Sequence, residues 1–476
     1  MWADLNPVRH PISDILITVN AKISLVWFRN DLRLEDNPAW EAAIARGNPI
    51  LPVYLWSPSE EGAWAPGAAS RVWLHGALDS LNRQLQKLGG QLILRQGNSA
   101  QTMLKQLISE LSENYEVDAI FWNRRYEPAI IERDKSIKEF FTQKNLTVQS
   151  FNSLLLVEPW EVKNKTGQPY KVFTPFWNSV LSQNQIPQSK SFNPKKLFFP
   201  KTWPKSELLA DLKLKPSIPW DEGIVQSWES DFDFRDFIEN HLAQYPTNRD
   251  IPNLVGTSRL SPYLHFGQIG PRQVWHAVQK FTGLHKQTGL AYGAEIYLKE
   301  LGWREFAHHL LYHFPQTAEQ PLRSEFAHFP WQKNKKLLEA WQKGHTGYPL
   351  VDAGMRELWA TGWMHNRVRM LVASFLVKHL RINWSEGARW FWDTLVDADL
   401  ASNTLGWQWS AGCGADAAPY FRIFNPTLQQ QKFDPQFLYI KKWVPEFDTP
   451  DYPKPIVDHV QARDAALEAF KSLSVR

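Results

Sequence analysis

The segment 401–426, ASNTLGWQWSAGCGADAAPYFRIFNP, holds the most informative set of side chains in the sequence. Two indoles, Trp407 and Trp409, follow the amide Asn403, and Asp416 precedes the basic aromatic run 420–422. Indoles offer flat faces that stack on bases, and they can also fill helical cores. With 24 Trp in the chain, a Trp-rich helical core is the simpler interpretation until other residues agree.

The segment 256–262, GTSRLSP, has the composition of a helix start. Ser261 suits the N-cap position and Pro262 suits the first helical position. Thr257, Ser258 and Arg259, together with free backbone N–H groups, would bind an anion. A plain helix cap and an anion site both fit this segment.

Two further clusters lie within predicted helices. Glu300 and Trp303 are three positions apart and therefore share one helix face, with Arg304 beside them. Asn366 and Met370 are four positions apart and share another face. A buried amide needs partners, which a ligand edge can supply, and methionine is a polarizable filler beside aromatic rings. Ordinary half-buried packing is the alternative for each cluster.

Two acids and an amide follow the apolar pair 391–392. Asp397, Asp399 and Asn403 lie in a Trp-rich neighbourhood, where carboxylates are costly unless they are paired. Arg369 is a candidate counter-ion, and ribose hydroxyls or a flavin edge would also satisfy these groups. Solvated acids at a helix end are the structural alternative.

Several classes of site lack their motifs in this sequence. We find no Ser/His/Asp nucleophile arrangement, no P-loop and no HExxH zinc motif. The adjacent histidines 308–309 diverge on a helix and chelate poorly, so no metal is expected. The single cysteine, Cys413, excludes an internal disulfide and fits a cytoplasmic protein. The net charge of +4 permits DNA binding, and no apolar run is long enough to span a membrane.

Strands and helices alternate over the first part of the chain. We predict strands at 23–28, 50–56, 92–94, 117–122 and 147–151, with helices at 38–46, 70–88, 100–112 and 128–141 between them. This order predicts a doubly wound parallel sheet with ligands at the carboxyl ends of its strands. No GxGxxG motif follows the strands, so a dinucleotide is not indicated there.

The remaining chain is predicted to be a connector followed by an all-α domain. We place an α/β domain at 22–153, a long, mostly irregular connector at 154–230 and a helical domain at 231–476. Helical spacing recurs at 234–244, 272–281, 291–312, 335–343, 351–361, 366–379, 385–395 and 460–473.

Taken together, the motifs resemble one family over about 22–460. The chain is similar to the photolyase/cryptochrome family, and to bacterial cyclobutane pyrimidine dimer photolyases in particular. The resemblance rests on ISLVWFRNDLRL at 23–34, YKVFTP at 170–175, GYP at 347–349, WMHNR at 363–367, WQW at 407–409 and DAAPYFRIFNP at 416–426.

This resemblance implies FAD bound by the helical domain and a flipped-out DNA lesion beside it. By motif match, the cofactor residues are Tyr245, Thr257, Ser258, Arg259, Leu260, Ser261, Arg369, Asp397, Ala398, Asp399 and Asn403. An amide at position 403 would face flavin N5 and favour reduced flavin; plant cryptochromes typically carry Asp there, so Asn favours a repair enzyme.

The resemblance also assigns residues to the lesion, to electron transfer and to DNA. Glu300, Trp303, Asn366, Met370 and Trp409 match the lesion pocket for cyclobutane dimers. Trp331, Trp384 and Trp407 match the chain that photoreduces the flavin, and Arg249, Arg304, Arg367, Arg422 and Gln429 match contacts to DNA phosphates. The implied activity is light-driven electron transfer from reduced FAD to the dimer, which splits into two pyrimidines.

The first domain of this family often holds an antenna pigment. The segment 67–75 resembles a folate-using bacterial subgroup, whereas 125–133 departs from the best-known folate-binding pattern. Methenyltetrahydrofolate is therefore favoured over 8-hydroxy-deazaflavin. A monomer acting on UV-damaged DNA in the cytoplasm, at the nucleoid, is expected. The alternative is a cryptochrome-type blue-light receptor, which usually has a long C-terminal tail that this sequence lacks.

Overall fold

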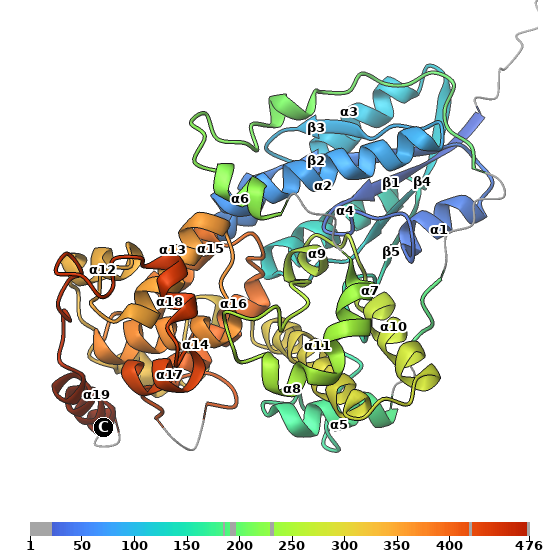
Figure 1. Ribbon diagram of the computed structural model, residues 1–476. Helices are drawn as coiled ribbons and strands as arrows, with labels where there is room; N and C mark the ends of the chain where they lie inside the picture. The colour runs from blue at the N-terminus through green and yellow to red at the C-terminus, as the bar shows by residue number, and fades with distance from the viewer. Residues whose placement is uncertain (1–20, 184–185, 191–196, 229–232, 418–420, 474–476) are drawn as a thin grey trace, which may run out of the picture.

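The computed structural model describes residues 21–183, 186–190, 197–228, 233–417 and 421–473. A sheet-containing part packs against a larger helical part (Figure 1). No helix among the described residues is long and apolar enough to cross a membrane.

The N-terminal part is built on a five-stranded parallel sheet with the order β3-β2-β1-β4-β5, which confirms the doubly wound prediction. The strands are β1 (Ala21–Phe28), β2 (Ile50–Trp56), β3 (Ile93–Gln96), β4 (Tyr115–Asn123) and β5 (Thr147–Phe151). Strand β2 is buried at every position, as its continuous apolar sequence requires in a sheet covered on both faces.

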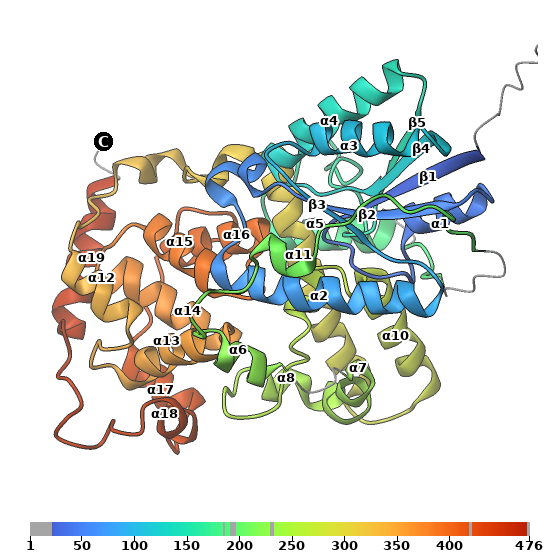
Figure 2. The same cartoon turned by 90° about the horizontal axis from the view of Figure 1, so that it is seen from above.

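Helices cover both faces of this sheet (Figure 2). Helices α1 (Pro38–Ala45) and α2 (Ala68–Lys87) pack on one face, where Val26 and Phe28 point. Helices α3 (Ala100–Leu111) and α4 (Pro128–Gln143) pack on the other face, with Leu25 and Trp27. The alternating side chains of one strand therefore serve two separate cores.

The carboxyl ends of β1 and β4, where the strand order reverses, hold protein groups. The Asn123 amide donates to Asn37 at 2.7 Å and to the Asp31 carboxylate. The neighbouring Leu32 N–H donates to the Phe266 carbonyl of the helical part at 3.0 Å. Protein groups therefore fill the carboxyl ends of these two strands and contact the helical part.

The connector is more ordered than its prolines predicted. It contains helix α5 (Phe173–Gln183), helix α6 (Glu222–Ser227) and a 3-10 turn at Leu209–Leu212. The prediction of an irregular segment was wrong for α5, because Phe176, Trp177 and Val180 form a buried stripe that packs on the helical part. Tertiary burial outweighs the nearby prolines here.

Most predicted helices of the C-terminal part are present, and several short ones were missed. The predicted helix 234–244 is instead broken into α7 (Phe234–Asp236), π and 3-10 turns, and α8 (Tyr245–Asn248), and 366–379 ends in a π-helical turn after α14 (Asn366–Ser374). Ser261 begins α9 (Ser261–His265) but Leu260 is the N-cap residue, so the cap prediction was one residue off. The other helices are α10 (Pro271–Leu284), α11 (Leu290–His313), α12 (Lys335–Gln342), α13 (Pro349–Thr361), α15 (Trp384–Thr394), α16 (Leu400–Ala411), α17 (Pro426–Phe433), α18 (Leu438–Trp443) and α19 (His459–Leu473).

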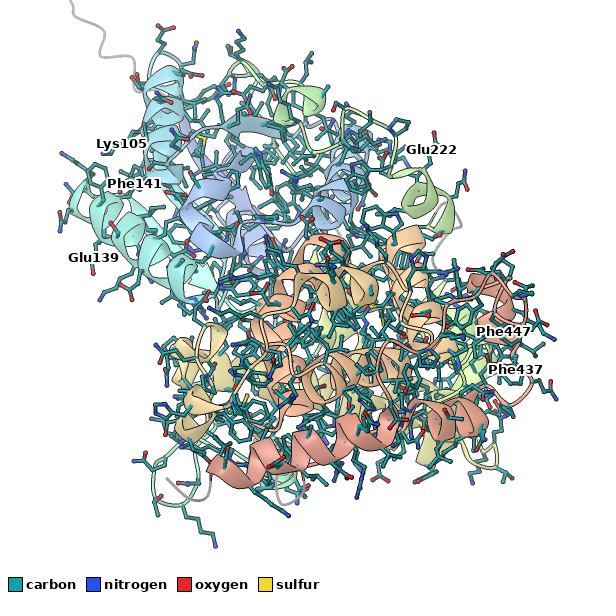
Figure 3. The ribbon with its side chains drawn as sticks, turned by 90° about the vertical axis from the view of Figure 1, so that its left-hand side faces the viewer. Lys105, Glu139, Phe141, Glu222, Phe437 and Phe447 are labelled. Atoms are coloured by element: carbon teal, nitrogen blue, oxygen red, sulfur yellow. The ribbon has the colours of Figure 1, made fainter. Side chains whose placement is uncertain are left out.

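The last helix, α19, packs on the outer surface of the helical part. Phe470 of α19 stacks on Phe421 with ring centroids 4.4 Å apart and also contacts Phe326. At the other edge, Phe437 and Phe447 stack at 5.2 Å, and Figure 3 shows them close together at the margin of this part. Aromatic pairs of this kind fasten the C-terminal segment to the core that surrounds Trp341 and Trp407.

Candidate cofactor and DNA-lesion site

The Glu300–Trp303 face of α11 is fixed by contacts from two other segments. The Trp303 ring stacks on Phe173 of α5, with centroids 3.8 Å apart and planes within 8°. Arg249 pairs with the Glu300 carboxylate at 2.6 Å. Desolvation raises the pKa of Glu300, and Arg249 opposes this shift. The arrangement places a carboxyl group that is paired with Arg249 beside an indole that is fixed by Phe173.

Consecutive residues 249–250 connect this face to α14. While Arg249 pairs with Glu300, the next residue, Asp250, pairs with Arg367 of α14 at 2.7 Å. The Arg367 guanidinium also lies 3.7 Å from the Met370 sulfur. Glu300, Met370 and two of the four predicted DNA arginines, Arg249 and Arg367, therefore belong to one local network. Asn366 is on the same helix but is exposed, so the premise of a buried amide was wrong.

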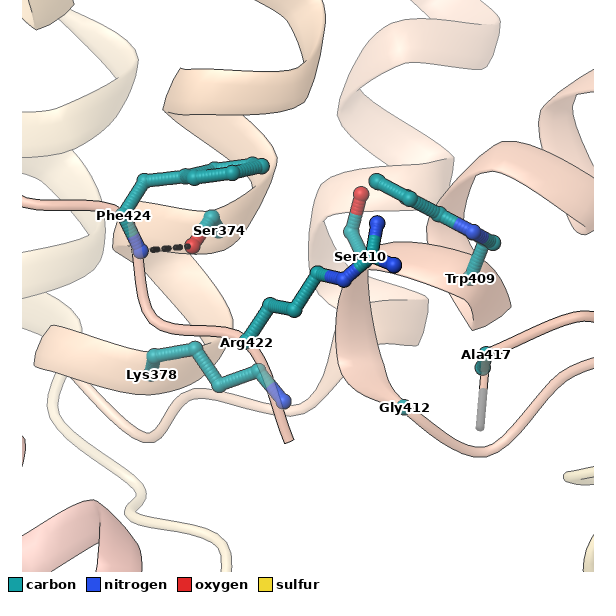
Figure 4. Close-up of a pocket in the computed structure, with 8 residues that line it drawn as sticks. All are labelled: Ser374, Lys378, Trp409, Ser410, Gly412, Ala417, Arg422 and Phe424. Atoms are coloured by element: carbon teal, nitrogen blue, oxygen red, sulfur yellow. Dashed lines mark hydrogen bonds between the residues drawn. The ribbon is translucent and has the colours of Figure 1, made fainter. Parts of the chain in front are cut away.

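Trp409 lines a small pocket at the end of α16 (Figure 4). The Arg422 guanidinium lies 5.8 Å from its ring centroid. Lys378 donates to the Ala411 carbonyl at 2.8 Å, so its amino group caps the helix that carries Trp409. Burial holds the pKa of Lys378 well below its ordinary range. Residues 418–420, part of the sequence motif here, lie outside the described residues.

Arg369 and Asp397 form the ion pair that the sequence suggested. Their side chains meet at 2.8 Å, and Arg369 also donates to the Met364 carbonyl at 2.7 Å. The other Asp397 oxygen is buried without a hydrogen-bond partner among the described residues. Such a group is costly unless a ligand or water satisfies it, so this oxygen indicates a bound polar group.

Asp399 is the N-cap residue of α16 and has cationic surroundings. One oxygen accepts from the Ser402 N–H at 2.7 Å, and the other lies 3.4 Å from His308 and 3.8 Å from His265. Burial alone would raise the pKa of Asp399, but the two histidines hold it well below its usual range. Asp399 is therefore ionised.

Asn403 has a defined amide orientation. Its nitrogen donates to the Ala388 carbonyl of α15 at 3.0 Å, and its oxygen has no hydrogen-bond partner among the described residues. An amide held in this way presents its oxygen as an acceptor. Ala398 and Leu260, two other predicted cofactor residues, are buried apolar side chains that can only contribute packing.

The 257–261 segment approaches the same region. Arg259 adopts a left-handed backbone conformation, with φ of 51°, and its guanidinium lies over Trp228 and Trp363 at 4.1 and 4.9 Å. Its Nε is buried without a partner among the described residues. The Ser258 hydroxyl accepts from Tyr297 at 2.9 Å. Tyr245 is buried under Arg249. The side chains of Thr257 and Ser261 are half-buried and exposed, respectively.

The three predicted electron-transfer tryptophans lie in one core. A side chain at Gly387 would meet the Trp407 ring at 2.0 Å, so Trp407 lies directly on α15. Trp384 is three residues before Gly387 and shares that helix face. The Gln332 N–H, next to Trp331, donates to the Arg381 carbonyl at 2.7 Å, just before α15. Two of the indoles are buried, and Trp331 is partly buried.

Two of the predicted DNA residues, Arg304 and Gln429, have no described contact with the lesion residues or with the network through residues 249–250. Arg304 donates to the Leu154 carbonyl of the connector at 2.6 Å, which ties it to the junction between the two parts. Gln429 is half-buried on α17. The sequence reasoning missed Asp250, Phe173 and His265. Only Asp250 carried a signal, as a charge next to Arg249.

These groups fit FAD as a resident cofactor. The unpartnered oxygen of Asp397, the unpartnered Nε of Arg259 and the free acceptor of Asn403 are hydrogen-bonding groups that a flavin dinucleotide would satisfy. No group of three or more candidate metal ligands occurs among the described residues. The unpartnered carboxylate oxygen, guanidinium nitrogen and amide oxygen suit a polar organic ligand.

Comparisons with known proteins agree with this geometry. A family model described as DNA photolyase matches residues 24–195, and one described as FAD binding domain of DNA photolyase matches 297–450. The deoxyribodipyrimidine photo-lyase of Agrobacterium fabrum is 44% identical over 94% of this chain and 98% of its own length. Cryptochrome-1 of Arabidopsis thaliana is 39% identical over 89% of this chain and 63% of its own.

A solved structure gives the same result. The crystal structure of a bacterial class III photolyase from Agrobacterium tumefaciens has a TM-score of 0.89 and 42% identity, and the match covers 98% of this chain and 100% of that one. These relatives extend over both the sheet and the helical parts. The chain therefore belongs to the DNA photolyase/cryptochrome family, as its sequence motifs predicted.

Proposed function

We propose that this chain is a deoxyribodipyrimidine photolyase that splits cyclobutane pyrimidine dimers in DNA. The observation that carries the proposal is the network through residues 249–250. It joins Glu300 of the lesion set on α11 to Arg367, and through it Met370, on α14. Deoxyribodipyrimidine photo-lyases among the relatives extend over nearly the whole chain.

The lesion would be held by aromatic faces and a carboxyl group. Trp303 is backed by Phe173, which leaves the other face of the indole for a base. Trp409 provides a second indole from α16. Flipping a damaged base out of the duplex costs a few kcal/mol, and stacking on such faces offsets that cost. Glu300, whose pKa desolvation raises, would donate to a pyrimidine carbonyl when protonated or accept from an N–H when ionised.

The cofactor residues would bind and orient FAD, which when reduced and excited supplies the electron that opens the dimer. Asp397, fixed by Arg369, keeps one buried oxygen for this cofactor. Asn403 would offer its amide oxygen to the protonated N5 edge of the flavin, because its nitrogen is held by Ala388. Tyr245 and residues 257–261 would line the diphosphate. Trp407, Trp384 and Trp331 would carry an electron from the surface to resting flavin.

DNA phosphates would contact the arginines around this site. Arg249 and Arg367 are each committed to one carboxylate, while Arg422 is exposed beside Trp409. We assign these three, with Gln429, to phosphate contacts. Arg304 is the weakest of the proposed DNA residues, because its side chain is less exposed (13%) than those of Arg249 (23%) and Arg367 (22%) and donates to Leu154 of the connector.

A second chromophore in the first domain is part of the proposal. We favour methenyltetrahydrofolate over 8-hydroxy-deazaflavin, on the resemblance of 67–75. In the structure this segment packs against the helical part: the Ser70 hydroxyl donates to the Leu395 carbonyl at 3.0 Å. Adding each pigment to the purified protein and measuring bound absorbance would distinguish them; retention of the deazaflavin alone would reverse the assignment.

The organisation proposed for the whole chain follows the predicted boundaries. Residues 22–153 would form the antenna domain, 154–230 the connector and 231–476 the domain that binds FAD and DNA. The enzyme would act as a monomer on damaged DNA at the nucleoid, in the cytoplasm. Light scattering of the protein alone and with damaged DNA would test the monomer.

Repair of a defined substrate is the decisive experiment. The reduced protein is mixed with an oligonucleotide that contains one thymine cyclobutane dimer, illuminated with blue light, and the repaired strand is followed by chromatography. A (6-4) oligonucleotide and a dark sample are the controls. Light-dependent repair of the dimer alone is expected. FAD binding without repair would favour the second candidate, a cryptochrome-type receptor, which the similarity to Cryptochrome-1 supports.

A further inference from the structure

His308 lies where the sheet part, α11 and the start of α16 meet. Its side chain is buried, at 3% exposure. One ring nitrogen, Nδ1, lies 3.0 Å from the Arg304 carbonyl oxygen one turn earlier on α11. The other, Nε2, lies 3.4 Å from the Asp399 carboxylate at the N-terminus of α16. Both nitrogens of this imidazole therefore face an acceptor.

The two acceptors determine the protonation of the ring. A backbone carbonyl only accepts hydrogen bonds, so Nδ1 carries a proton. The Asp399 carboxylate is ionised and likewise only accepts, so a proton belongs on Nε2 as well. Burial alone would lower the pKa of His308, yet Asp399 raises it above its ordinary value. Geometry and charge thus agree on an imidazolium.

His265, the second imidazole near Asp399, differs. Its Nε2 lies 3.4 Å from the amide nitrogen of Asn30, which follows β1. This ring nitrogen therefore has a partner in the sheet part and faces away from Asp399. Its Nδ1 is 3.8 Å from Asp399, too far for a hydrogen bond. His308, with Nε2 at 3.4 Å, is the nearer of the two imidazoles to Asp399.

The other groups around His308 keep this charge in place. The Tyr126 ring meets the imidazole edge-on at 6.3 Å, and its hydroxyl donates to Glu158 of the connector at 2.7 Å. Arg304 on the same helix opposes the imidazolium, while Glu305 favours it. Glu127 of the sheet part repels Asp399 at longer range. Among these groups, Asp399 is the one whose carboxylate faces a ring nitrogen of His308.

We infer that His308 is a charged positioning residue of the cofactor site, whose imidazolium fixes the ionised Asp399 for FAD and makes FAD retention depend on its proton. This inference rests on the proposed assignment of Asp399 to FAD. Removing the positive charge would let Asp399 turn away or take up a proton, and either change weakens its hydrogen bond to the cofactor.

The direction of the pH dependence follows from the raised pKa of His308. The cation is present below this pKa and is lost as the pH rises through it. FAD affinity should therefore fall toward alkaline pH, beyond the ordinary range of histidine. Any contribution of the pair to folding stability is likewise present at lower pH and is lost in the same alkaline direction.

Nuclear magnetic resonance of the unaltered protein tests the charge directly. Protein labelled with ¹⁵N-histidine is titrated with and without FAD, and the His308 signals are assigned with His308→Gln. Both ring nitrogens should remain protonated above the ordinary histidine pKa of about 6.5. A neutral ring with one protonated nitrogen at about pH 7 would overturn the inference, and this readout on the unaltered protein needs no repair activity.

FAD binding to variants tests the consequence. At neutral pH, His308→Gln should raise the Kd for FAD by roughly tenfold or more. His308→Arg should bind FAD as the parent protein does, and its Kd should no longer depend on pH. His285→Gln, at an exposed histidine after α10, should leave the Kd unchanged. In an Asp399→Asn background the His308→Gln effect should vanish; an undiminished effect would refute a role through Asp399. A protein that binds FAD with this pattern but repairs no dimer would refute the proposed function and leave the inference intact.

Discussion

Two charge clusters, one in each part of the molecule, differ in how their polar atoms are paired. At the strand ends of the sheet part, Arg125 pairs with both Glu61 and Glu127 at 2.7 Å, so each of these three groups has a charged partner within the protein. In the helical part, Asp397 has one paired and one unpartnered oxygen, and Arg259 has an unpartnered Nε. A closed set of charges is stable without a ligand, whereas an open set indicates one.

The largest expected effect is on the rate of flavin photoreduction, which separates tryptophans of the electron path from other tryptophans. Trp331→Phe should nearly abolish photoreduction of the bound flavin while sparing repair by enzyme that was chemically reduced beforehand. Trp160→Phe, on the connector, is the matched control and should change neither. Absorbance under blue light with an electron donor measures the rate. Normal photoreduction in Trp331→Phe would remove Trp331 from the electron path.

The open and closed charge sets can be compared directly. Asp397→Asn should weaken FAD binding by about 2–5 kcal/mol, because Arg369 loses its partner and the cofactor loses an acceptor. Glu61→Gln disrupts a closed ion pair of the sheet part and should leave the FAD-to-protein absorbance ratio unchanged. Equal FAD loss in both variants would mean that the contrast between the two parts does not reflect the cofactor site.

A buried pair of histidines in the helical part predicts that the free energy of unfolding decreases at acidic pH. His379 lies 2.9 Å from His459 of α19, and burial, followed by the neighbouring His459, lowers the pKa of His379 to about 4. The unfolded ring protonates first, near pH 6.5, so stability is complete above that pH and declines as the pH falls toward 4, by about 3 kcal/mol.

Urea unfolding at about pH 7 and about pH 5 measures this decline. His379→Gln should lose part of the difference in unfolding free energy between the two pH values, and His285→Gln, at an exposed histidine, should retain it. An identical pH dependence in His379→Gln and the parent protein would contradict the assignment to His379.

The smallest expected effect distinguishes a role of Glu300 in lesion binding from a role in cofactor binding. Glu300→Ala should lower dimer repair by about 1.5–3 kcal/mol in transition-state terms, since one hydrogen bond to a charged or polarised group is lost. FAD should remain bound. Glu295→Ala, on the same helix but solvent-exposed in its pair with Lys299, is the control. Loss of FAD from Glu300→Ala would place Glu300 in the cofactor site.

Periodicity and motifs were sufficient for most of the fold. Strands 50–56 and 147–151 were predicted with their observed bounds, because they are short apolar or β-branched runs between turns. Helix α5 was missed because its stripe is buried by α11, which is distant in sequence. The break within 234–248 was missed because local spacing does not reveal where a helix turns aside to satisfy tertiary contacts.

The site was predictable by residue type more than by arrangement. The Arg369–Asp397 pair followed from the cost of unpaired buried acids. The exposure of Asn366, the link through Asp250 and the attachment of Arg304 to Leu154 depend on how separate helices pack. No spacing rule within one helix contains that information.

The stacking of Phe470 on Phe421 has a practical meaning for protein engineering. Phe421 is followed directly by Arg422, so the final helix supports from behind the segment that would meet DNA. A bulky fusion or a truncation at the C-terminal helix would displace Phe470 from Phe421. A fusion before β1 would instead be attached to the sheet part, away from this stack. Affinity tags, fluorescent reporters and surface tethers should therefore be attached at the N-terminus.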